Sequence, residues 1–132
     1  MRSMRVILRG RLAGPVLVLA AMGATCRSST PASPSTGTNA VTFTITAAGV
    51  VPKTATIDIG DRVLFVNNDT KAHSIVSDPH PDEDDCPNIN QVGFLKPADK
   101  HETGNFVASR TCGFHDHDAP TDATLTGTIT IR

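Results

Sequence analysis

The sequence contains no tryptophan and no tyrosine, and its five aromatic residues are all phenylalanine. The only methionines are Met1, Met4 and Met22, so no thioether ligand is available after residue 22. The core of a folded domain must therefore depend on valine, isoleucine and leucine packed around a few phenylalanines. We expect Phe43 and Phe65 to be the large inward-facing residues.

Acidic residues are also absent from the start of the chain, where none occurs before Asp58. Four arginines precede an apolar run at residues 12–24, a pattern typical of an export signal. The run is shorter than the ~20 residues that a membrane-spanning helix needs. We expect residues 1–26 to be a signal peptide and the protein to be exported to the periplasm or cell surface. Lipid attachment at Cys26 is an alternative ending of this signal.

Removal of the leader changes the charge of the remaining chain. Eight basic residues then accompany all 13 acidic ones, giving a net charge of about −5. Nucleic-acid binding depends on a basic patch, which this composition does not supply, so we exclude a nucleic-acid partner. A metal cation or a basic protein partner fits better. The acidic run at residues 82–85 is either a solvated loop or a docking patch for such a protein.

Residues 27–40 are rich in serine, threonine and proline and predict a disordered linker. The folded domain is expected at 41–132, where apolar and polar residues alternate with the period of two that is typical of strands. No convincing helical period occurs there. We predict an all-β sandwich with strands at 41–47, 54–59, 62–67, 73–76, 105–108 and 125–131.

Cysteine and histidine gather in three segments of this domain. His73 begins a predicted strand, His80 and Cys86 flank the acidic run, and residues 112–117 contain one cysteine and two histidines. Copper is bound by imidazole nitrogen and thiolate sulfur, and a Cys-x-x-His segment on a tight loop can present both. The sequence therefore predicts a copper site in which His73 meets the 112–117 segment.

Several of these segments resemble the plastocyanin- and amicyanin-like cupredoxins. The similar segments are Gly49-Val-Val-Pro52, residues 57–63, 65–69 and 73–76, then Cys112-Gly-Phe-His115 and residues 127–131, in the order of that family. The resemblance implies a Greek-key β-sandwich that binds one copper ion per chain and transfers electrons as a monomer. It also implies His73, Cys112 and His115 as the equatorial copper ligands.

Two features depart from that family. The weak axial methionine has no counterpart, so the axial position is either empty or filled by His117, Asp118 or a backbone carbonyl. In addition, Cys86 and Cys112 would share an oxidising compartment, where two cysteines commonly form a disulfide. With such a disulfide the protein would instead store or deliver copper through a nitrogen-rich site without blue colour, drawn from His73, His80, His115 and His117.

Other functions account for less of the sequence. A metal-free interaction module on the cell surface would leave the cluster at residues 112–117 unexplained. No arrangement of a nucleophile and a base is evident, so we do not expect an enzyme. His101 lies in a charged turn and is expected to be a surface residue.

Overall fold

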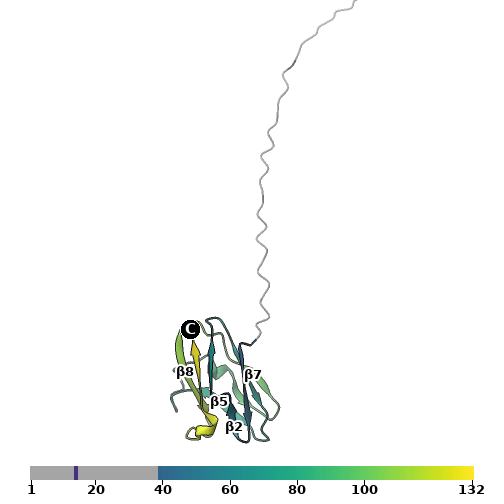
Figure 1. Ribbon diagram of the computed structural model, residues 1–132, viewed down its shortest axis with the longest axis vertical. Coiled ribbons are helices and arrows are strands. Elements are labelled where there is room, and N and C mark those ends of the chain that lie inside the picture. The colour runs from purple at the N-terminus through teal and green to yellow at the C-terminus, as the bar shows by residue number, and fades with distance from the viewer. Residues whose placement is uncertain (1–13, 15–38) are drawn as a thin grey trace, which may run out of the picture. The chain divides into compact units, whose positions relative to one another are not determined.

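In the computed structural model of the chain, the structure describes Gly14 and residues 39–132. Strands and loops make up most of this part, together with two short 3-10 helices (Figure 1). The elements are β1 (Val41–Thr46), β2 (Gly49–Val51), β3 (Thr54–Ile57), β4 (Val63–Asn67), β5 (His73–Ser77), η1 (Ile89–Gln91), β6 (Gly93–Leu95), β7 (Lys100–Glu102), β8 (Arg110–Asp116), η2 (Ala123–Leu125) and β9 (Gly127–Ile131). Apart from Gly14 and residues 39–40, the expected signal peptide and linker lie outside the described residues. Within those residues, no helix has the length and apolar character needed to cross a membrane.

The strands form two sheets. One has the order β2-β1-β4-β7 and the other β3-β9-β8-β5-β6. Strand β1 runs parallel to β4, and β3 parallel to β9, while the other pairs are antiparallel. The predicted all-β sandwich is therefore confirmed.

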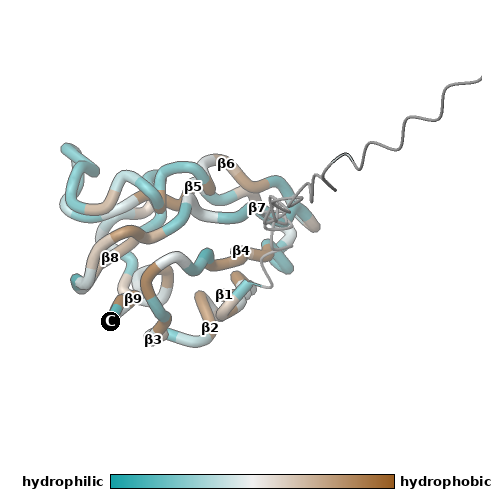
Figure 2. The backbone as a smooth tube through the Cα atoms, turned by 90° about the horizontal axis from the view of Figure 1, so that it is seen from above, coloured by the Kyte–Doolittle hydropathy of each residue, from teal (hydrophilic) through white to brown (hydrophobic). Residues whose placement is uncertain are grey.

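Three phenylalanines join the two sheets. Phe43 and Phe65 stack with ring centroids 5.1 Å apart, and Phe114 from the other sheet meets Phe43 edge-on at 5.0 Å. All three side chains are fully buried, which confirms the prediction for Phe43 and Phe65. Such aromatic pairs each contribute about 0.5–1.5 kcal/mol beyond the burial of their area. Figure 2 shows hydrophobic colour along strands such as β4 and mostly hydrophilic colour in the peripheral loops.

Most of the predicted strands are present, with small differences at their ends. The prediction of a strand at 105–108 is wrong, although Phe106 is buried as an inward residue should be. The backbone N–H of Phe106 donates to Asp61 O, and its carbonyl accepts from Gly60 N. This segment therefore bonds to a turn instead of joining a sheet. Strands β2, β6 and β7 have only three residues each, too few to show a period in the sequence.

Strand β8 replaces the tight loop that we expected around residues 112–117. Its register pairs Asp116 with Ile75, His115 with Val76 and Phe114 with Ser77 on β5. Neighbours along a strand point to opposite faces of a sheet, while cross-strand partners share a face. Phe114 and Asp116 therefore face the interior of the sandwich, and His115 faces outward.

A disulfide joins Cys112 on β8 to Cys86 in the loop between β5 and β6. Both cysteines are buried in the core, at 1% exposure or less. A sulfur atom in a disulfide is no thiolate, so Cys112 is not available as the expected copper ligand. The disulfide also fixes the 78–92 loop against β8.

We expect the Cys86→Ala/Cys112→Ala variant to lose roughly 2–4 kcal/mol of unfolding free energy, because the cross-link restricts the unfolded chain. Urea denaturation followed by circular dichroism measures this loss, with Cys26→Ala as the unaffected control. Thiol titration of unfolded, unreduced Cys26→Ala protein should find no free thiol. Two free thiols would contradict the disulfide.

Candidate metal centre

Three histidines and one glutamate meet on the outer face of the five-stranded sheet. His115 and His117 come from the end of β8, and His80 and Glu83 from the 78–92 loop that covers it. We call these four residues the histidine cluster. His117 directly follows β8, and its N–H donates to Ser74 O, which continues the pairing with β5 and brings His117 to the same face as His115.

The carboxylate of Glu83 lies at the centre of this cluster. Its Oε1 is 3.7 Å from Nδ1 of His80 and 4.0 Å from Nε2 of His115. It also accepts a short hydrogen bond from Nδ1 of His117. One ligand atom each from His80, Glu83 and His115 lie within 4.8 Å of one another, a spacing that suits a shared metal ion.

His115 has the geometry of a metal ligand that is already oriented. Its side chain is 3% exposed, and its Nδ1 lies 2.7 Å from Oδ1 of Asp78. A carboxylate only accepts hydrogen bonds, so Nδ1 carries a proton, and in the neutral imidazole Nε2 then carries the lone pair. That buried Nε2 has no hydrogen-bond partner. An unpaired buried acceptor is costly, and a metal ion at this position would satisfy it.

The loop holds Glu83 in position through its backbone. Its N–H donates to Pro79 O, and its carbonyl accepts from the side-chain amide of Asn90. The same Asn90 side chain accepts from Ser77 N at the end of β5. Glu83 has a φ of 54°, in the left-handed region that residues other than glycine adopt only when their surroundings fix them. Its carboxylate is thereby presented to the three imidazoles.

Expected ligand His73 lies elsewhere. It shares the interior face with Ile75 and Asp116, so His73 and His115 are on opposite faces of the sheet. Cys112 is three residues from His115 and also faces the interior, beside Phe114. The structure therefore does not form the expected site of His73, Cys112 and His115, whatever the redox state of the cysteines.

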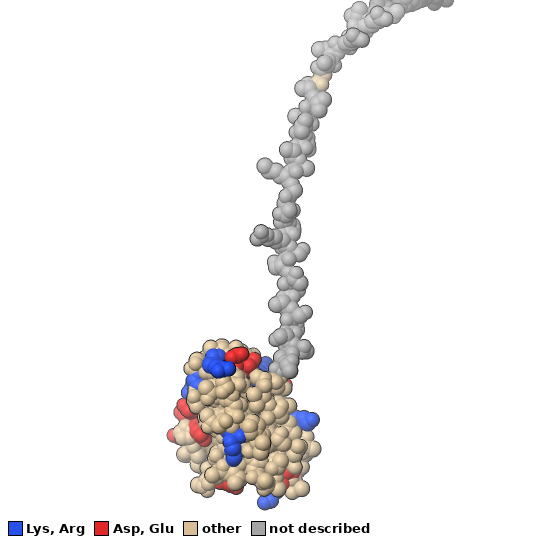
Figure 3. All heavy atoms as spheres, viewed as in Figure 1, with Lys and Arg blue, Asp and Glu red and all other residues tan. Residues whose placement is uncertain are grey.

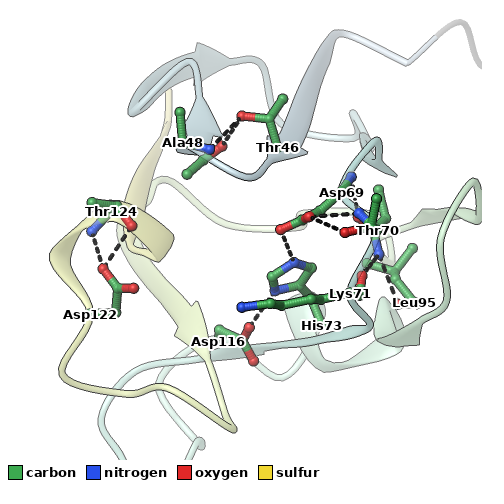
Figure 4. Close-up of polar contacts among 12 residues, drawn as sticks. Thr46, Ala48, Asp69, Thr70, Lys71, His73, Leu95, Asp116, Asp122 and Thr124 are labelled. Carbon is green, nitrogen blue, oxygen red and sulfur yellow. Dashed lines mark hydrogen bonds and ion pairs between the residues drawn. The ribbon is translucent and has the colours of Figure 1, made fainter.

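Instead, His73 is enclosed by two carboxylates (Figure 4). Nδ1 is 2.7 Å from Oδ2 of Asp116 and Nε2 is 3.2 Å from Oδ2 of Asp69, and all three side chains are at most 8% exposed. Burial raises the pKa of Asp69, but hydrogen bonds from Thr70, His73 and Lys71 outweigh this and leave the pKa below its usual 3.8. With both ring nitrogens facing carboxylates, His73 has a structural role on the interior face.

The group around His73 lines a cavity of about 270 Å³. Asp118, one of the expected axial candidates, lines this cavity, and its N–H donates to Asp116 Oδ1. It therefore belongs to the surroundings of His73, while His117 belongs to the histidine cluster.

The remaining candidates divide into structural and cluster residues. His101 binds Val92 O through Nδ1 at 2.7 Å and is half-buried, so it is less exposed than a surface residue. His80, left as an alternative ligand by the sequence, does enter the cluster. Glu83 was missed because nothing in the acidic run 82–85 distinguishes it from its neighbours; only the turn of the loop does.

Comparison with solved structures gives matches across the described domain. A purple cupredoxin from Nitrosopumilus maritimus aligns with a TM-score of 0.54 at 18% identity, over 70% of this chain and 99% of that one. Amicyanin from Paracoccus versutus aligns with a TM-score of 0.56 at 13% identity, over 70% of this chain and 80% of that one. Plastocyanin from Dryopteris crassirhizoma aligns with a TM-score of 0.53 at 17% identity, over 69% of this chain and 99% of that one. The fold is of the cupredoxin type.

The cupredoxin likeness is one of fold. No protein-family model matches the chain. No curated protein matches it in sequence either. At 13–18% identity the predicted cupredoxin sandwich is confirmed, but the ligands must be argued from this chain's own residues.

The hydrogen bond and negative charge of Glu83 raise the pKa of His117 above its usual 6.5. We expect Glu83→Gln to lower this pKa, measured by NMR titration of the imidazole. The pair stabilises the fold fully below pH 6.5, and this stability disappears as pH rises through the raised pKa. Asp84→Asn, which removes a charge from the same loop, should change the pKa of His117 much less than Glu83→Gln does. An equal change in both variants would contradict the role of Glu83.

Proposed function

We propose that the protein binds one copper ion in the histidine cluster and stores or delivers it. The observation that carries this proposal is the buried, unpartnered Nε2 of His115, which lies near Glu83 and His80 in a group whose ligand atoms are all within 4.8 Å of one another. The donor set supports copper(II), since imidazole and carboxylate together suit that ion.

A blue electron-transfer site is less well supported. Residues 39–132, which the structure describes, offer no sulfur ligand, because Cys86 and Cys112 are bonded to each other and no methionine follows Met22. The cupredoxin fold favours electron transfer as the second candidate, and one of the similar amicyanin structures was solved as Cu(I). Imidazole and carboxylate ligands alone would give a pale copper site with a large hyperfine splitting.

Access to the cluster also supports storage or delivery. The side chains of His80 and His117 are 39% and 47% exposed, so a copper ion there would be open to exchange with a partner. By contrast, the ring of His115 is buried and would form the fixed side of the site. Exposed ligands favour exchange, whereas the fixed ligand would set the geometry.

Export and an acidic surface complete the proposal. The arginine-rich leader supports export, with or without lipid attachment at Cys26. The charge of about −5 on the mature chain favours a basic copper-exchange partner. Basic residues form isolated spots on the face seen in Figure 3, with no broad positive patch there. That the protein is monomeric and not an enzyme stays a prediction.

Copper titration with optical and paramagnetic-resonance spectra tests this function. We expect one copper(II) per chain and a pale nitrogen- and oxygen-ligated spectrum. His115→Ala should weaken binding by more than the roughly 10–100-fold that loss of a ligand's hydrogen-bond partner costs. His73→Ala is the matched control, since it removes a buried histidine on the other face, and should leave the affinity within about threefold.

Three results would contradict the proposal. A chain that takes up no copper would remove the function. An intense blue band would show sulfur ligation. Loss of binding in His73→Ala but not in His115→Ala would move the site to the other face of the sheet.

A further inference from the structure

We infer, on the basis of the proposed metal-binding function, that Asp78 is a positioning residue for His115 and that Gly113 provides the space for it. Asp78 does not enter the group of candidate ligands around Glu83. Its contact is with the far nitrogen of the imidazole, Nδ1, at 2.7 Å. It can therefore act on a metal only through His115.

The backbone fixes Asp78 at the place where this contact forms. Its N–H donates to Gly113 O on β8, and its carbonyl accepts from Asp85 N. The first of these bonds extends the pairing of β5 with β8 by one residue and puts Asp78 on the same face as His115, while the second ties Asp78 to its own loop. The imidazole is buried while the carboxylate is about half exposed, so the carboxylate reaches it from the solvent side.

Gly113 is the residue over which the carboxylate lies. A Cβ at this position would be 1.9 Å from Oδ2 of Asp78 and 2.9 Å from its Cγ. The three nearest atoms to that Cβ all belong to Asp78. A side chain here would thus meet this carboxylate first and push it away from His115.

The contact decides which nitrogen of His115 is free. A neutral imidazole carries one proton. Without Asp78, no hydrogen bond to this carboxylate would favour the tautomer with the proton on Nδ1. On Nε2 it would face Glu83, whose Oε1 is 4.0 Å away. The Nε2 lone pair would then be lost to the metal. Asp78 prevents this by holding the proton on the opposite nitrogen.

Nitrogen-15 NMR of the metal-free protein tests the tautomer directly. We expect His115 to show a protonated Nδ1 and an unprotonated Nε2 in the wild type. Asp78→Ala should give a mixture of tautomers, and Asp78→Asn, which keeps an oxygen acceptor, should lie between. Asp82→Asn removes an exposed charge from the same loop and should leave the tautomer unchanged. An unchanged tautomer in Asp78→Ala would overturn the inference.

Metal affinity, measured by calorimetry with copper(II) and with zinc(II), tests the consequence. We expect Asp78→Ala to weaken binding by about 10–100-fold, the usual effect of losing such a partner. Gly113→Ala should weaken it similarly by displacing the carboxylate. In the Asp78→Ala background, however, Gly113→Ala should have almost no further effect, because the two atoms that it would clash with, Oδ2 and Cγ of Asp78, are then absent.

The outcomes separate this inference from the proposed function. If the wild type binds no metal, the proposed function fails, and the NMR tautomer still decides the role of Asp78. If the wild type binds metal and the affinities of Asp78→Ala and Gly113→Ala equal that of the wild type, the positioning role is overturned. Independent, additive losses from Asp78→Ala and Gly113→Ala would overturn the role of Gly113. Unfolding temperatures of each variant show whether a loss of binding reflects unfolding.

Discussion

Along strand β8, alternate side chains are directed to opposite faces of the five-stranded sheet, and this pleat separates groups that one metal ion would need together. Cys112 and Phe114 point into the core, where the cysteine forms a disulfide with Cys86 and the phenylalanine ring packs edge-on against Phe43 and Phe65. His115 leaves on the other side. A residue spacing of three between a thiol and an imidazole suits a loop, but on a regular strand it prevents joint ligation. The chemistry of the domain follows from β8 being a strand.

The outer face gains its polar site from the 78–92 loop. The disulfide ties this loop to β8, Asn90 links Glu83 to the end of β5, and the backbone of Asp78 continues the β5–β8 pairing. The last two contacts each fix one carboxylate relative to His115, and the disulfide fixes the loop that carries both. An acidic loop that would otherwise be solvated thereby becomes part of a site with three imidazoles.

The interior face uses the same types of residue for a different purpose. His73 lies between two buried carboxylates, each of which is within hydrogen-bonding distance of one ring nitrogen. This group lies beside a cavity and belongs to the packing of the sandwich. Histidine and aspartate therefore occur on both faces, but only on the outer face does a buried imidazole nitrogen remain unpaired among the described residues. The likeness to amicyanin and plastocyanin in fold thus comes with a different arrangement of candidate ligands.

From the sequence alone, the period-two alternation identified the sandwich, because alternation records which side of each strand is buried. Local chemistry likewise placed Phe43 and Phe65 in the core and left a Cys86–Cys112 disulfide open as an alternative. Tertiary structure decided the rest. Whether residues 110–116 form a loop or a strand depends on pairing with β5 and β9, which no local pattern encodes. The part played by Glu83 depends on how a loop turns, and that in turn depends on contacts with residues distant in the chain.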